Sequence, residues 1–180
     1  ALGLVATPAA IVPGGFFRVN LLVIMGLATF AALVAPAAAP GRTWLLPAAA
    51  AVLAWLGGIA WYGERRRAGT AFCAACAAAL AAAVAMLAGS PAASAAAVVS
   101  GLVTGLTVHA MLLGHWYLNA PGMRVDALRR MIDIALAAWA AQVAIAAAGL
   151  LPWRPPADAT AVALLALRWL AGLVGLPVLL

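Results

Sequence analysis

The chain is poor in charge, and this scarcity limits what kind of protein it can be. Its 180 residues include only 4 acidic and 10 basic side chains, so 8% of the residues are charged. A soluble domain carries about a quarter charged residues, which means that this chain cannot cover a globular surface with polar groups. The acidic residues are also dispersed along the sequence, and this excludes a mechanism that depends on paired carboxylates.

Cysteine, histidine and lysine are scarce or absent as well. The chain has 2 cysteines and 2 histidines, and two cysteines three positions apart do not make a disulfide framework. Every basic residue is arginine, and the arginines do not form a stripe with interleaved aromatics, so nucleic-acid binding has no support. No Walker loop, HExxH zinc motif or GxSxG elbow occurs.

Long apolar runs are what the chain has in their place, and 68% of its residues are hydrophobic. About 20 apolar residues cross a hydrocarbon core of about 30 Å, and runs without alternation favour helices over a barrel. Proline, glycine and arginine divide the sequence into six such runs. We therefore predict an all-α, polytopic transmembrane helical bundle that forms a single integral-membrane domain over 1–180. Its spans are expected at about 17–35, 44–62, 70–89, 93–118, 130–151 and 161–180.

The arginines predict the orientation of this bundle. Arginine is enriched in the cytoplasmic loops of membrane proteins, and Arg42 and Arg154 fall on one side of the predicted topology. The opposite side carries the N-terminus and the two loops near residues 65 and 124, and it holds Arg18, Arg65, Arg66, Arg67, Arg124, Arg129 and Arg130. This side should therefore be cytoplasmic. The arginine-only, alanine-rich composition is typical of a GC-rich bacterial genome. We expect a multi-pass protein of the bacterial inner (cytoplasmic) membrane, and a processed or partial chain because it starts without methionine.

The fourth span contains the principal candidate site. Gly101, Gly105 and His109 recur every four residues and so share one helix face. An ionisable side chain within a bilayer is a functional-site hypothesis by default, and small residues allow a flat ligand or another helix to approach closely. This face is interpreted either as a groove for a haem or quinone ring, or as a helix-packing surface in which His109 forms a hydrogen bond to a neighbouring helix.

His115 lies six residues beyond His109, which rotates it by about 240° and raises it by roughly 9 Å. The two imidazoles therefore cannot face one metal ion from a regular helix. A second axial ligand for a haem would have to come from a methionine or a partner chain, and the intramembrane methionines are Met25, Met86 and Met111. His115 itself is interpreted as an interfacial anchor, or alternatively as a proton-accepting or quinone-binding group at the cytoplasmic rim.

Arg168 and the two cysteines are the remaining candidates. Arg168 lies about 10 Å inside the sixth span, where it either extends to the membrane surface or pairs with a haem propionate, a lipid phosphate or another subunit's carboxylate. Cys73 and Cys76 occupy one face of the third span. They form either a redox or soft-metal pair, or two small apolar side chains.

We expect, from these residues, an accessory integral-membrane subunit of a bacterial redox or energy-conserving complex. Its role would be chiefly anchoring or structural, without catalytic activity of its own, and with contact to a haem b or quinone near His109. Its partners would be the lipid bilayer and other membrane subunits. The alternative is a small-molecule permease, although polar side chains at mid-depth are few.

Overall fold

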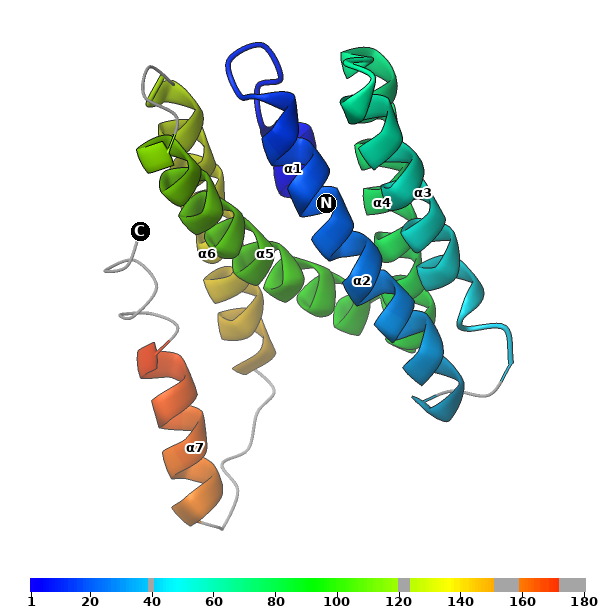
Figure 1. Ribbon diagram of the computed structural model, residues 1–180. Helices are drawn as coiled ribbons and strands as arrows, with labels where there is room; N and C mark the ends of the chain where they lie inside the picture. Colours follow the sequence, from blue (N-terminus) through cyan, green and yellow to red (C-terminus); the bar gives the residue numbers. More distant parts are fainter. Residues whose placement is uncertain (39–40, 120–123, 151–158, 172–180) are drawn as a thin grey trace.

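The computed structural model of the chain is an array of helices (Figure 1). It describes residues 1–38, 41–119, 124–150 and 159–171, and within these ranges it does not describe the side chains of residues 38, 149, 150, 161, 165 and 168. The helices of this described part are α1 (Leu2–Ala6), α2 (Gly14–Ala38), α3 (Leu45–Tyr62), α4 (Arg66–Leu87), α5 (Pro91–Asn119), α6 (Asp126–Leu150) and α7 (Ala159–Leu170).

Five of these helices, α2 to α6, are long and apolar enough to cross a membrane. Their apolar stretches run over Gly14–Ala37, Leu45–Tyr62, Arg66–Leu87, Pro91–Asn119 and Asp126–Ala148. The prediction of a polytopic helical membrane protein is therefore confirmed. The described part of α7 has 12 residues, and residues 172–180 of the predicted sixth span lie outside the described residues, so that span stays a prediction.

The turns between the spans follow the glycine and proline signals of the sequence. Gly89 has a φ of 70°, a conformation that glycine adopts without strain, and it reverses the chain between α4 and α5. Ser90 then accepts a hydrogen bond from the Ala93 N–H at 3.2 Å, and α5 starts at Pro91, where the missing N–H costs nothing. Pro36, in contrast, was predicted to close the first span, but α2 continues through it to Ala38.

The spans associate in two groups. Helices α2, α3 and α4 pack side by side, and α5 packs chiefly on α6. Helix α5 runs obliquely to the others (Figure 1), as expected for a helix of 29 residues, since its length of about 44 Å exceeds the hydrocarbon core of about 30 Å. The short helix α1, which the sequence analysis placed outside the spans, contacts α4 and α5 and so links the two groups.

The bulky core side chains gather at the end of the bundle where α2 begins and α3 ends. Phe17 stacks on Trp61 with ring centroids 4.0 Å apart and an interplanar angle of 11°. Phe16 makes edge contacts with Phe17 and with Trp116 at 6.0 Å and 5.8 Å. Trp61 is only 3% exposed, so it belongs to the packed core, whereas its neighbour Tyr62 faces outward at the helix end.

Candidate functional site

His109 lies in the interior of the bundle, on the side of α5 that faces α1. Its side chain is 6% exposed, which makes it one of few buried polar groups in the described part of the chain. A polar group buried among apolar side chains is costly unless it forms a hydrogen bond. The buried imidazole therefore needs a hydrogen-bond partner for its ring nitrogen within the bundle.

Thr7 is that partner. Its Oγ1 lies 2.7 Å from His109 Nε2 and donates to the Gly3 carbonyl oxygen, also at 2.7 Å. A hydroxyl has one hydrogen, so when it is used on Gly3, Nε2 must carry the proton and donate to Oγ1. The same oxygen lies 3.7 Å from Met131 Sδ on α6. Thr7 thus joins the segment that follows α1 to both α5 and α6.

The close approach of α1 to this imidazole depends on a glycine. A Cβ atom at Gly3 would lie 2.9 Å from His109 Cγ, closer than real Cβ contacts allow. On another side of the ring, Phe16 makes an edge contact with centroids 5.1 Å apart. Gly3, Thr7 and Phe16 therefore contact His109, Met131 adjoins it through Thr7, and we call these five residues the His109 cluster.

The glycines of the predicted groove do not belong to this cluster. Gly101 and Gly105 are exposed, and a methyl group added to either would meet nothing within 4 Å. They share a face of α5 with His109, but α1 packs on that face at the histidine, whereas no described residue packs on it at the two glycines. The described residues therefore do not combine Gly101, Gly105 and His109 in one enclosed pocket.

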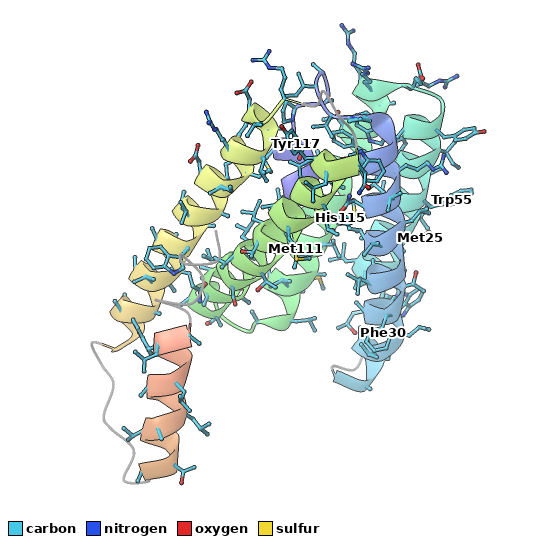
Figure 2. The ribbon with its side chains drawn as sticks, turned by 60° about the vertical axis from the view of Figure 1, so that its left-hand side comes forward. Met25, Phe30, Trp55, Met111, His115 and Tyr117 are labelled. Carbon is cyan, nitrogen blue, oxygen red and sulfur yellow. The ribbon has the colours of Figure 1, made fainter. Side chains whose placement is uncertain are left out.

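His115, Met86 and Met111 are exposed on the bundle, whereas Met25 is half-buried against the core. Figure 2 shows Met111, His115 and Tyr117 in succession along α5, with Met25 on α2. His115 is exposed, and Met111 is 65% exposed. Met131, which the sequence analysis did not name, instead has its Sδ 3.7 Å from the Thr7 hydroxyl that contacts the buried imidazole.

Arg168 lies in the last turns of α7, but its side chain lies outside the described residues. Its predicted pairing with a propionate, a phosphate or a carboxylate accordingly stays a prediction. Among the described residues, no group of three or more histidine, cysteine, aspartate or glutamate side chains could hold a metal ion.

No protein-family model matches this chain, and neither a curated protein nor a solved structure shows significant similarity to it. The assignment of a function consequently depends on the geometry of the chain itself.

The two cysteines are free thiols in the middle of the α2–α3–α4 group. Cys73 and Cys76 are both fully buried, and Cys76 Sγ donates a weak hydrogen bond to the Ala50 carbonyl oxygen at 3.4 Å. Buried thiols away from solvent pack as small apolar side chains, and their burial limits access of oxidants. This environment favours the packing interpretation over the redox one.

The structure shows why sequence reasoning missed Gly3 and Thr7 of the His109 cluster. Residues 1–7 are too few to span a membrane, and Pro8 and Pro13 isolate them from the first span. The signal that could have found them is the pair Gly3 and Thr7, spaced four apart on one face of a short apolar helix. A small residue and a hydroxyl at this spacing are typical of a helix that packs closely on a polar partner in a membrane.

Proposed function

We propose that this chain is an accessory integral-membrane subunit, chiefly structural, of a bacterial inner-membrane redox or energy-conserving complex. The observation that supports a subunit is the uncovered face of α5. Gly101 and Gly105 lie in a span of 29 residues, and apart from the adjoining backbone of α5 itself, the described chain has no atom within 4 Å of a methyl group placed on either. Helices in membranes associate through such small residues because their backbones can approach closely.

The burial of His109 supports a structural role for its imidazole. A haem iron or a quinone oxygen at Nε2 would have to replace Thr7 Oγ1, which lies at 2.7 Å. Replacement would also separate α1 from α5, because Gly3 contacts the same ring. The redox part of the proposal therefore depends on cofactors held by partner subunits, or by surfaces shared with them, rather than on an open site at His109.

The test is the size and colour of the protein after mild solubilisation of the native membrane. Native electrophoresis should show the chain in a large assembly, and Gly105→Leu should release it, because a leucine would keep a partner helix at a distance. Gly26→Leu is the matched control: Gly26 is also an exposed glycine of a span with nothing within 4 Å of an added methyl. It should leave the assembly intact, because the residues four positions away on its face, Leu22 and Phe30, are large and already keep a partner backbone at a distance.

A reduced-minus-oxidised spectrum of the same assembly tests the redox assignment. A haem signal that migrates with the assembly and survives His109→Ala is expected if partner subunits hold the cofactor. Loss of the signal in His109→Ala, but not in His115→Ala, would make His109 itself a ligand. A colourless chain that migrates alone would refute the subunit proposal and favour the permease, whose test is uptake into proteoliposomes.

A further inference from the structure

A second polar feature lies at the end of the bundle where α2 begins, α3 ends and α4 begins. The three helix ends surround a cavity of about 300 Å³. The arginine distribution predicts that this end faces the cytoplasm, and the cavity lies at the level where the spans emerge from the membrane. The residues that line it are Gly14, Gly15, Arg18, Trp61, Tyr62, Glu64 and Arg66.

Two guanidinium groups, those of Arg18 and Arg66, line this cavity together with a single carboxylate. Arg18 lies over the ring of Tyr62, with Cζ 5.2 Å from the ring centroid, and this contact orients the side chain at the cavity wall. In the described part of the chain, the ion pair that forms is Arg124–Asp126, so neither Arg18 nor Arg66 is neutralised by a carboxylate. Glu64 also lines the cavity, which leaves an excess of one positive charge.

The backbone adds further positive potential to the same space. The first amide groups of a helix have no partner within the helix and favour an anion nearby. Helix α2 begins at Gly14 with two glycines that lie beside the rings of Trp61 and Trp116, and α4 begins at Arg66, where the N-cap residue forms no side-chain hydrogen bond. Two long helices therefore direct their amino ends toward the cavity that Arg18 and Arg66 line.

We propose that this cavity binds the phosphate group of an anionic membrane phospholipid. Guanidinium groups donate paired hydrogen bonds to phosphate oxygens, and helix amino ends complement their charge. The bilayer is the source that fits the position, because the cavity opens beside Tyr62, which is 75% exposed at the end of a span. A soluble phosphate compound would present the same chemistry, and the experiment must distinguish the two.

The experiment measures lipid retention by the full chain in nanodiscs of phosphatidylcholine mixed with phosphatidylglycerol, followed by native mass spectrometry. Wild type should retain phosphatidylglycerol in preference to phosphatidylcholine. Arg18→Gln and Arg66→Gln should each weaken that preference by about fivefold, the effect of one basic side chain near an anionic surface. Arg129→Gln is the control, because Arg129 is an exposed arginine of the same predicted side that does not line the cavity.

Glu64→Gln provides a test of opposite sign. It removes the one carboxylate of the cavity, so phosphatidylglycerol retention should rise by a similar factor, an outcome that damage to the fold would not produce. Circular dichroism melting of each variant checks that the fold is kept. Equal retention of both lipids by wild type, or equal losses in Arg18→Gln and Arg129→Gln, would overturn the proposal.

Titration with inorganic phosphate distinguishes the source of the anion. Displacement of phosphatidylglycerol by millimolar phosphate would overturn the assignment to a lipid and favour a soluble phosphate compound, whereas retention supports the lipid. This inference is independent of the proposed function, because the cavity and the uncovered face of α5 have no residue in common. Failure of one test therefore leaves the other unaffected.

Discussion

Replacement of Thr7 by valine should remove the hydroxyl contact of His109 and leave the size of the side chain almost unchanged, because valine has a methyl group in place of the hydroxyl. The Gly3 carbonyl oxygen would keep a partner, since it also accepts the Thr7 N–H at 3.0 Å. His109 Nε2 would lose Thr7 Oγ1, which lies at 2.7 Å. Leaving a buried group without its partner costs about 1–2 kcal/mol, and we expect the free energy of unfolding to fall by that amount.

Two measurements check this expectation. The first is the free energy of unfolding, from titration of the detergent-solubilised protein with sodium dodecyl sulfate and detection by circular dichroism. The second is acylation by diethyl pyrocarbonate, with mass spectrometry of the two histidine peptides. In wild type, the exposed His115 should react quickly and the buried His109 slowly. In Thr7→Val, His109 should react faster, while His115 should be unchanged.

The matched control is Thr104→Val. Thr104 is an exposed threonine of α5 whose hydroxyl donates to the Ser100 carbonyl oxygen of its own helix at 3.1 Å. The same chemical change there should alter the free energy of unfolding by less than about 0.5 kcal/mol, and Thr7→Ser should retain most of the wild-type stability. The reasoning is refuted if His109 reacts as fast as His115 in wild type, or if Thr7→Val and Thr104→Val are equally stable.

Two further substitutions test the packing of the spans, both by the same titration. Gly69→Ala should lower the free energy of unfolding by about 1–3 kcal/mol, because the new Cβ would lie 2.5 Å from Trp61 Nε1 and the buried ring cannot move away. Gly58→Ala, with nothing within 4 Å of its Cβ, should be neutral or stabilising. Equal losses of stability in the two variants would contradict this expectation. Glu64 has a φ of 55°, so Glu64→Gly should raise the free energy of unfolding by about 0.5–1 kcal/mol by relieving left-handed strain. Glu64→Ala removes the same carboxylate but keeps the strained backbone conformation. An equal increase in the free energy of unfolding for Glu64→Ala would show that the effect comes from loss of the charge and not from relief of strain.

The sequence predicted the spans well because length and hydrophobicity decide whether a helix crosses a membrane. Apolar runs of this kind define α2 to α6 to within a few residues at most ends. Pro36 was a misleading signal: a proline near a helix end removes one hydrogen bond without stopping the helix, and α2 extends two residues beyond it. Helix α1 was missed because five helical residues give no span signal, and its burial depends on contacts with α4 and α5.

The candidate site was predicted in part. An intramembrane histidine requires a partner, and His109 has one, but Thr7 is 102 positions away in the sequence and nothing local indicates it. The spacing of Gly101, Gly105 and His109 also could not say which part of their shared face another helix covers: α1 covers it at His109, and no described residue covers it at the two glycines. In a soluble protein the polar face of a helix indicates the outside, whereas in a membrane both the lipid and the interior are apolar, so periodicity loses that information.

The distribution of side chains assigns different tasks to the two ends of the bundle. Phe16, Phe17 and Trp61 fill the end where α2 begins, and large aromatic contacts of this kind stabilise helix packing strongly. At the opposite end of α5, the exposed residues up to Gly101 are proline, alanine, serine and glycine, and no described side chain packs on Gly101. Stability within the chain and association with a partner helix are therefore separable: a substitution at the aromatic end should unfold the subunit, whereas one on the glycine face of α5 should release a folded one.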